Sequence, residues 1–402
     1  MGPLTRLQHR VAALLMGVCL VMASGCTALG PRSIQTTRVD YNVAIQQTNE
    51  QELLLNLVRL KYRDSLYFLG VEKVASSVEL LREMGASASL PEGGANTYTL
   101  GAGRIAVNEK PTVFYAPLDG ERFTRQMLTL LHPDILVLLA NSGWSLERLM
   151  SLMFQEMNGL KNAPSATGPT PGYEPVYAEF RQAVRHLRSL QVRKLIDVGQ
   201  ISDTGSAHLE LPFLPDATQD PEALAFKTLL GLSATEHSFK VVVGLGHGGP
   251  HAIHVVPRSL IGIMNYLSQG VVPPAGDVAA GKVTRRTRAD GSEFDWQAVM
   301  GGLFRVEVTD TAPPDAAISV RHRGHWFSIP DNDLESRSTF GLLSQLMALQ
   351  AGTARREPTP ISFPFPAETQ SGHCCLRTRG SSVDSPKPDG RKSVFSQAET
   401  TG

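Results

Sequence analysis

The chain has 402 residues, 42% of them hydrophobic and 19% charged, which is an ordinary composition for a protein that buries a core. That composition excludes wholesale disorder, and 36 glycines without a fixed period exclude a collagen-like chain. Lys and Arg together count 38, and Asp and Glu together also count 38, so the formal net charge is zero. The charge balance therefore does not indicate nucleic acid or an anionic membrane surface as a partner.

Residues 1–25 are predicted to be a signal peptide rather than part of the fold. Arg6, His9 and Arg10 make a basic start, and residues 11–23 form an apolar run of 13. A helix needs about 20 apolar residues to cross a bilayer, so this run is too short to span one. A basic start, a short apolar run and small residues after it are typical of a secretory signal.

Ala23, Ser24, Gly25 and Cys26 resemble the lipobox of bacterial lipoproteins. The resemblance implies cleavage by signal peptidase II before Cys26, a diacylglycerol on its thiol and an acylated amine. Two or three acyl chains anchor a protein firmly, because each buried CH₂ contributes about 0.8 kcal/mol. Thr27 follows in place of Asp, which by resemblance to enterobacterial lipoproteins implies the outer membrane. The alternative is an ordinary secretory signal in which Cys26 has no special role.

A tether, a helix and several strands are predicted after the signal. Residues 27–38 are expected to be a polar, flexible tether. Asp40 is a candidate N-cap for a helix that runs to about Tyr62. Residues 67–71 suggest a strand, residues 74–84 fit either a helix or a strand, and residues 86–116 suggest two or three antiparallel strands.

Helices dominate the next part of the chain. Predicted helices cover residues 119–131, 133–142, 146–157 and 174–195. Gly143 separates the second from the third, and Ser145 is a candidate cap for the third. The proline-rich residues 158–172 are predicted to form a loop or linker.

Beyond residue 195, short strands alternate with helices. Strands at 195–201 and 207–213 are expected to pair, Asp220 to open a helix over 221–230, and strands at 239–243 and 252–256 to form a hairpin. A helix over 258–267, strands at 303–308, 317–321 and 326–329, and a helix that Asp333 or Ser336 caps and that ends at Gly352 follow. Residues 361–366 are expected to complete the fold.

These elements predict an α+β fold of antiparallel sheets packed with helices in two lobes. The first lobe covers residues 39–195, and the second covers residues 196–366. A lipidated tether over residues 26–38 precedes them. Residues 367–402, which contain Cys374 and Cys375, are polar and are predicted to form a disordered tail.

Four segments, residues 51–64, 142–171, 258–273 and 325–350, resemble an uncharacterised group of envelope proteins from Gram-negative bacteria. The resemblance covers about residues 40–366 and leaves out the tail. It implies a place in the cell envelope, and it implies no activity, catalytic residue or partner.

Gly244, Gly246 and Gly249 match the G-x-G-x-x-G pattern of dinucleotide-binding proteins. That function requires a helix to begin at the third glycine, where its N-terminus holds a pyrophosphate. Pro250 and a strand-like segment follow instead. The pattern therefore favours a glycine-rich turn between two strands, and no cofactor is predicted.

Histidines gather at two places, His247, His251 and His254 in one and His322 and His325 in the other. Three imidazoles could hold zinc, but His251 and His254 are an odd number of residues apart and would point to opposite faces of a strand. Solvated turn histidines are the favoured interpretation, and no metal site is predicted.

Catalytic motifs are missing from the mature sequence: it has no G-x-S-x-G, no S-x-x-K and no cysteine nucleophile in its core. Acidic residues such as Asp315 and Asp331 with His325 could support acid–base chemistry, but most folded proteins offer such a set. No catalytic residue is predicted.

Tryptophans are the candidate interface residues. Trp144, Trp296 and Trp326 belong to a set of aromatic residues that are expected to be exposed, and aromatic side chains often anchor protein interfaces. Burial in the core explains tryptophans equally well.

Residues 317–350 predict a β-hairpin around Gly324 followed by a helix. Val320, Trp326 and Ile329 are the candidates for the core face of the hairpin. The apolar stripe of the helix is predicted to contain Phe340, Leu343, Leu346, Met347 and Leu349. Packing the helix across the hairpin buries both apolar faces, so this unit is expected to be the most stable part of the second lobe, with a structural role for Trp326.

The sequence as a whole predicts an outer-membrane lipoprotein that is anchored through Cys26 and faces the periplasm. A non-catalytic binding or scaffold component is the favoured function, with the bilayer and other envelope proteins as partners and no nucleic acid. The alternative is a periplasmic hydrolase that acts on glycan or peptide. The oligomeric state stays open.

Overall fold

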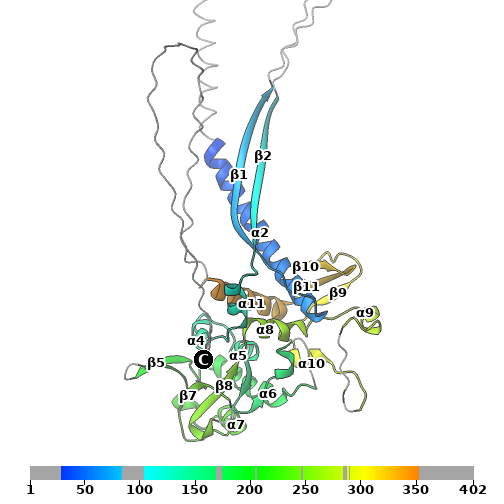
Figure 1. The fold of residues 1–402 in the computed structure, drawn as a ribbon. Coiled ribbons are helices and arrows are strands. Elements are labelled where there is room, and N and C mark those ends of the chain that lie inside the picture. The colour runs from blue at the N-terminus through cyan, green and yellow to red at the C-terminus, as the bar shows by residue number, and fades with distance from the viewer. Residues whose placement is uncertain are drawn as a thin grey trace, which may run out of the picture. The chain divides into compact units, whose positions relative to one another are not determined.

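The computed structural model describes residues 29–83, 104–168, 174–203, 206–245, 248–283, 288 and 290–352. They all lie within one compact unit, residues 1–356. Helices, antiparallel ribbons and a mixed sheet follow one another along the chain (Figure 1), so the predicted α+β class is confirmed. The signal peptide, Cys26, residues 361–366 and the predicted tail lie outside the described residues.

The centre of the fold is a six-stranded sheet in the order β4-β3-β8-β7-β6-β5. Its strands are β3 (Phe154–Met157), β4 (Leu160–Lys161), β5 (Gly199–Asp203), β6 (Ser206–Pro212), β7 (Ser238–Val243) and β8 (Ala252–Pro257). Strands from both sides of residue 195 are neighbours in this sheet, because β3 pairs with β8. The lobe boundary predicted at residue 195 therefore lies within one continuous sheet with one shared core.

β7 and β8 run parallel, so the predicted hairpin between them is wrong. Lys240 pairs with Ala252 and Val243 with Val255, which means that the chain returns to the start of β7 before β8 begins. A Cβ on Gly248 would lie 2.3 Å from the carbonyl oxygen of Ala252, so only glycine fits there. The glycine-rich segment thus allows a short return connection, where the prediction had placed a simple turn.

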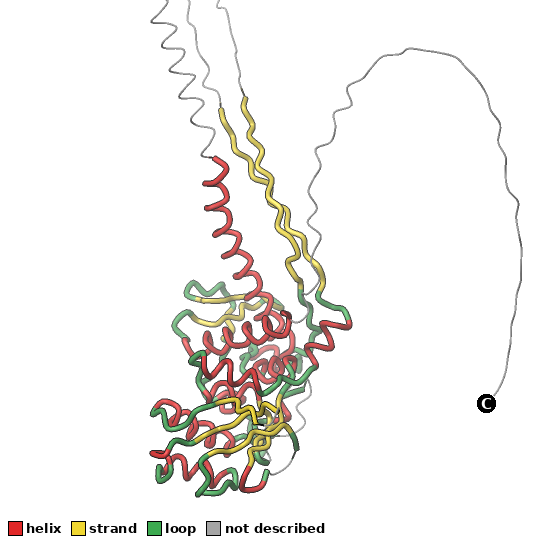
Figure 2. Tube along the Cα trace, turned by 90° about the vertical axis from the view of Figure 1, so that its left-hand side faces the viewer, coloured by secondary structure: helices red, strands yellow, loops and turns green. Residues whose placement is uncertain are grey.

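Helices pack on this sheet and on one another (Figure 2). The helices between β2 and β9 are α3 (Glu121–Leu128), α4 (Asp134–Asn141), α5 (Leu146–Met153), α6 (Ala178–Val192), α7 (Pro221–Leu229), α8 (Leu260–Ser268), α9 (Ala275–Ala279) and α10 (Trp296–Met300). Short 3-10 turns cover Pro164–Ala166, Pro215–Ala217 and Gly249–His251. α8 is buried on nearly all sides and contacts α2, α3, α5 and α11.

One of two predicted helix ends is confirmed, and the other is wrong. Asp220 caps α7 as predicted, since its carboxylate accepts hydrogen bonds from the backbone N–H groups of Glu222 and Ala223. The predicted helix over residues 146–157 instead ends at Met153, and its last four residues form β3. Residues 154–157 form a strand because they pair with β8. This long-range interaction overrides local helix propensity.

A three-stranded sheet in the order β10-β11-β9 and helix α11 form the unit predicted over residues 317–350. The strands are β9 (Glu307–Thr309), β10 (Ala316–His322) and β11 (His325–Pro330), and α11 covers Leu334–Gly352. Arg323 and Gly324 have φ values of 50° and 91°, as a tight hairpin turn requires. Of the two candidate caps, Asp333 caps α11 by accepting a 3.0 Å hydrogen bond from the N–H of Ser336.

Trp326 is not on the core face of this hairpin. Val320 pairs with Phe327, and Phe327 and Ile329 have no exposed surface, whereas Trp326 is partly exposed. Trp326 and Ile329 are three residues apart and so point to opposite faces, because side chains alternate along a strand. In α11, Leu349 is 44% exposed and Leu342 is buried, which shifts the predicted stripe by part of a turn.

α2 (Leu29–Lys61) begins earlier than predicted, so residues 29–38 are helical and Asp40 lies inside the helix rather than at its cap. Polar side chains do not prevent helix formation, since propensity differences among ordinary residues are small. Beyond about Gln51 the helix enters the core, where Leu53, Leu54 and Leu57 are buried. Residues 38–49 are exposed except for Tyr41 and Ile45, which are partly buried.

β1 (Leu69–Glu83) and β2 (Arg104–Pro117) form a long antiparallel hairpin with a bulge between Val71 and Lys73. Residues 74–83, which fitted either a helix or a strand, are thus a strand. In Figures 1 and 2 this hairpin and the first half of α2 extend beyond the six-stranded sheet and its helices. Residues 84–103 lie outside the described part of the chain.

Candidate functional site

The three candidate interface tryptophans lie in three different environments. Trp296 is only 9% exposed and packs edge-on against Phe294, with ring centroids 5.2 Å apart, so it belongs to the core. Trp144 is partly buried, packs against the core, and its carbonyl accepts a 3.0 Å hydrogen bond from Gln191. Trp326 is the third, and it is partly exposed on β11. These residues do not form one shared surface feature.

The histidines are also separate from one another. His251 is an exposed partner of Glu236, and the backbone N–H of His254 donates to Asn158 across the sheet. His322 contacts Asp64, and His325 contacts Asp310. Within the described residues, which do not include His247, no group of three His, Cys, Asp or Glu side chains is placed to hold a metal ion.

A polar cluster surrounds the C-terminal end of α2. It joins side chains that are distant in the sequence, and we call it the α2-end cluster: Tyr62, Asp64, Asp277, Lys282, His322 and Arg323. These residues come from the segment directly after α2, from α9 and the loop after it, and from the end of β10 and the turn that follows.

One half of the cluster is centred on a buried hydroxyl. Tyr62 donates a 2.7 Å hydrogen bond to the carboxylate of Asp277, which also binds Lys282 at 2.6 Å. Burial, and then the neighbouring carboxylate, raise the pKa of the Tyr62 hydroxyl, which therefore stays protonated at neutral pH. Hydrogen bonds from Lys282 and Tyr62 lower the pKa of Asp277. The negative charge of Asp277 is balanced by Lys282 and accepts a hydrogen bond from Tyr62, which is the arrangement of a structural contact.

The other half is centred on Asp64. Its carboxylate binds Arg323 at 2.8 and 3.0 Å and His322 at 3.2 Å. The guanidinium of Arg323 also lies 4.7 Å from the centre of the Tyr62 ring, within the range of a cation–π contact. Burial lowers the pKa of His322, so its ring is neutral at pH 7. Together the two halves attach the end of α2 to the β10–β11 turn and to α9.

Lys61 lies next to this cluster, and within the described residues its ammonium forms no ion pair with a carboxylate. Its ammonium is 3.5 Å from the carbonyl oxygen and from the side-chain oxygen of Gln269, and the residue is 9% exposed. Burial lowers the pKa of Lys61 to about 8. A charged ammonium at this position therefore opposes folding at neutral pH.

Replacing Lys61 by Met is expected to change how stability depends on pH. In the wild-type protein the unfolded chain binds more protons than the folded one between pH 8 and about 10.4, so the free energy of unfolding rises with pH in that window. The rise is expected to be up to about 3 kcal/mol, because one pKa unit corresponds to about 1.4 kcal/mol. Below pH 8 this stabilisation is absent.

Urea unfolding of both proteins from pH 7 to 10 measures this effect. Because Met does not titrate, the free energy of unfolding of Lys61→Met is expected not to rise above pH 8. The variant is therefore expected to be more stable than wild type at pH 7, and the difference is expected to shrink as the pH increases. Lys240→Met, at an exposed position of β7, is the control and should follow the wild-type profile. A constant difference between wild type and Lys61→Met across the range would contradict the prediction.

Arg258 is fully buried at the junction of β8 and α8. Its guanidinium donates to the carbonyl oxygens of Ser151, Leu152, Phe154 and Asn162 and to the hydroxyl of Thr167. Two of those carbonyls belong to the last turn of α5, where a positive charge is favourable. Burial lowers the pKa of Arg258 to about 10, which leaves it cationic at neutral pH. The sequence interpretation did not identify this residue.

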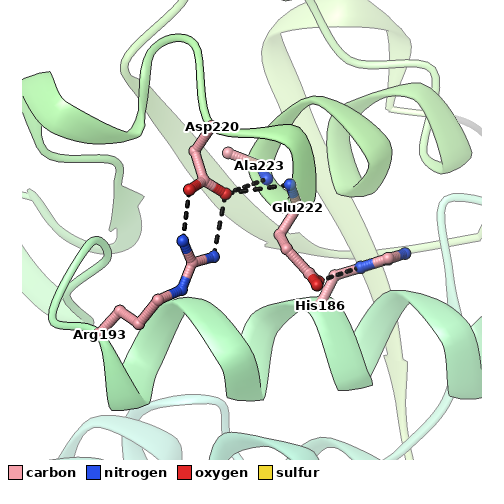
Figure 3. A network of polar contacts seen from close by, with 5 residues as sticks. All are labelled: His186, Arg193, Asp220, Glu222 and Ala223. Carbon is pink, nitrogen blue, oxygen red and sulfur yellow. Dashed lines mark hydrogen bonds and ion pairs between the residues drawn. The ribbon is translucent and has the colours of Figure 1, made fainter.

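α6 and α7 are joined by two ion pairs (Figure 3). Arg193 binds the carboxylate of Asp220 with both of its terminal nitrogens, and His186, about two turns earlier on α6, contacts Glu222. The pKa of Asp220 is lowered mainly by Arg193. Because Asp220 is also the N-cap of α7, one carboxylate fixes the start of α7 and its position on α6.

Two cavities in the body are small. A polar one, lined by Arg181, Tyr266 and neighbouring residues, has a volume of about 10 Å³. An apolar one lies between α5 and the sheet, against Met150 and Ile253, and has a volume of about 20 Å³. Each has room for about one water molecule, so neither can hold a sugar ring or a peptide residue.

Comparison with known proteins identifies no relative: no family model, no curated protein and no solved structure matches the chain. In the part of the chain that the structure describes, no helix is both long and apolar enough to cross a bilayer.

Proposed function

We propose that the protein is a lipoprotein of the outer membrane, anchored through Cys26 and facing the periplasm, that acts as a non-catalytic assembly component of the envelope. The observation that carries this proposal is α2. It is helical from Leu29, three residues after Cys26, and its other end is fixed in the core and in the α2-end cluster. A membrane anchor joined to such a helix would set the position of the body relative to the bilayer.

The attachment of the hairpin to α2 supports the same function. The side chain of Asn56, which is fully buried, bonds both the carbonyl and the N–H of Tyr67, at 2.8 and 3.1 Å. Glu52 accepts a 2.7 Å hydrogen bond from the N–H of Leu69, the first residue of β1. Helix and hairpin are therefore presented together by one rigid junction. A scaffold needs surfaces held in a fixed relation, whereas a hydrolase needs a substrate pocket.

Metabolic labelling with palmitate tests the anchor. Wild-type protein expressed in a Gram-negative host is expected to take up label and to fractionate with the outer membrane, and Cys26→Ala is expected to lose both. Cys19→Ala is the matched control, because Cys19 lies in the predicted signal peptide and should leave labelling unchanged. Labelling that survives in Cys26→Ala would refute the anchor, and turnover of a cell-wall glycan or peptide by the purified protein would refute the non-catalytic function.

A further inference from the structure

His322 lies where the end of α2 meets the β10–β11 turn (Figure 1), and we call the contacts of Tyr62 and Asp64 with His322 and Arg323 the α2–turn contact. The Nε2 atom of His322 is 3.2 Å from a carboxylate oxygen of Asp64, and the ring meets the Tyr62 ring edge-on with centroids 5.5 Å apart. The side chain is only 17% exposed. An ionised carboxylate can only accept hydrogen bonds, so Nε2 carries the hydrogen and Nδ1 is the atom that can gain a proton.

Asp64 already has a cationic partner from the same turn. Both oxygens of its carboxylate accept hydrogen bonds from the guanidinium of Arg323, at 2.8 and 3.0 Å. The same guanidinium lies 4.7 Å from the centre of the Tyr62 ring. A protonated His322 is therefore a second cation that competes for one carboxylate.

The surroundings of His322 on balance keep its ring neutral. Burial has the largest effect and lowers its pKa, Asp64 raises the pKa, and Arg323 and Arg59 lower it. The charged groups that α9, β11 and the loops beside them bring to this region are bound to one another, in the pairs Asp277–Lys282 and Asp310–His325. A change in the charge of His322 therefore acts first on the contact between Asp64 and Arg323.

The direction of this pKa shift sets the direction of the pH effect. A histidine whose pKa in the folded protein lies below the ordinary value of about 6.5 binds fewer protons than an exposed one. Acid therefore favours a state in which the ring of His322 is exposed. The α2–turn contact is at full strength above about pH 6.5 and is weakened as the pH falls below that value.

We propose that His322 is a proton sensor: in acid its protonation opens the α2–turn contact and loosens the attachment of the end of α2 to the body. Leu54 and Leu57, which have no exposed surface, do not titrate, so the helix stays in the core while the contacts at its end open. This inference goes beyond the proposed assembly function, and it does not depend on the membrane anchor.

Hydrogen–deuterium exchange of the purified full chain at pH 7.5 and pH 5.5 tests the sensor. After correction for the intrinsic effect of pH on exchange, residues 58–64 and 318–326 are expected to exchange at least about threefold faster at pH 5.5. Residues 146–153 of α5 are the internal reference and are expected to show no such change. Equal rates at the two pH values in the α2–turn contact, or an equal acceleration in α5, would overturn the proposal.

Two histidine variants form a matched pair. His322→Gln keeps a hydrogen-bond donor for Asp64 but cannot titrate, so its corrected exchange rates are expected to be the same at both pH values. His325→Gln removes the histidine that lies opposite His322 in the β10–β11 register and is expected to keep the wild-type response. An acid response that survives in His322→Gln, or that disappears in His325→Gln, would contradict the assignment.

Two further variants separate this sensor from other causes. Burial raises the pKa of Glu52 on the same helix, but Glu52→Gln can still accept the hydrogen bond from the N–H of Leu69 and is expected to keep the response. Arg323→Gln removes the competing cation and is expected to reduce the ratio of the exchange rates at the two pH values, which decides the question if His322→Gln does not fold. An undiminished ratio in Arg323→Gln, or loss of the response in Glu52→Gln, would place the sensor elsewhere and overturn the proposal.

Discussion

Replacing Arg258 by Met is expected to lower the free energy of unfolding by about 2–6 kcal/mol. The change removes the guanidinium but leaves the carbonyls of Leu152 and Asn162 buried without their side-chain donor. A buried polar group that loses its partner costs about 1–3 kcal/mol, and two such groups account for the expected range. Natural domains are stable by about 5–15 kcal/mol, so the loss is a large fraction of the total.

Thermal and urea unfolding of three variants shows whether the loss of stability comes from the hydrogen bonds of the buried guanidinium or from the loss of a positive charge. Arg258→Lys keeps the charge but cannot reproduce the planar fork of donors, and an intermediate loss is expected. Arg125→Met removes a 77% exposed arginine that pairs with Glu121 one turn away on α3, and a change within about 0.5 kcal/mol is expected. If Arg258→Met unfolded at the same urea concentration as Arg125→Met, the buried guanidinium would have no structural role.

Replacing Phe327 by Ala is expected to cost about 3–5 kcal/mol, the usual range for a fully buried aromatic residue. Phe327 has no exposed surface, lies opposite Val320 in the β10–β11 register, and contacts the Tyr62 ring edge-on with centroids 6.3 Å apart. The substitution would leave a cavity where α2 meets the hairpin of the three-stranded sheet. The melting temperature should fall accordingly.

Trp326→Ala is the matched control, because it removes a larger side chain from the adjacent position on the other face of the same strand. It is expected to cost less than half as much as Phe327→Ala, since Trp326 is partly exposed. The opposite order would mean that β11 is shifted by one residue, which moves every side chain to the other face. Circular dichroism melts of the two variants under identical conditions decide between the two registers.

Local signals in the sequence predicted several elements correctly. The spacing of Phe180, Val184 and Leu187 predicted the buried face of α6, and all three are buried. Asp220 and Gly324 marked a helix start and a hairpin turn, because capping and positive φ angles depend on residues close in the chain. The α+β class followed from the same local information.

Long-range pairing could not be predicted in this way. The sequence shows that β7 and β8 are strands, but the parallel direction depends on a return path that involves the close approach at Gly248. The sequence analysis assigns both Trp326 and Ile329 to the core face, although the two residues are three positions apart on one strand. Alternation along the strand is the stronger criterion there.

The α2-end cluster and Arg258 were missed for different reasons. The cluster joins residues 62, 64, 277, 282, 322 and 323, and no sequence pattern links positions so far apart. Arg258 did leave a signal, because it directly follows an apolar strand and precedes an apolar helix.

The length of α2 has a mechanical consequence. Asn56 fixes the helix near one end, and Leu29 lies 27 residues away, about 40 Å at the usual rise of a helix. A change of only about 5° in the angle between this helix and the body would move Leu29 by about 3–4 Å. Small adjustments at the buried contacts of Asn56, Tyr62 and Asp64 are therefore amplified, and the helix acts as a lever that converts them into a change of tilt between the body and whatever holds its N-terminal end.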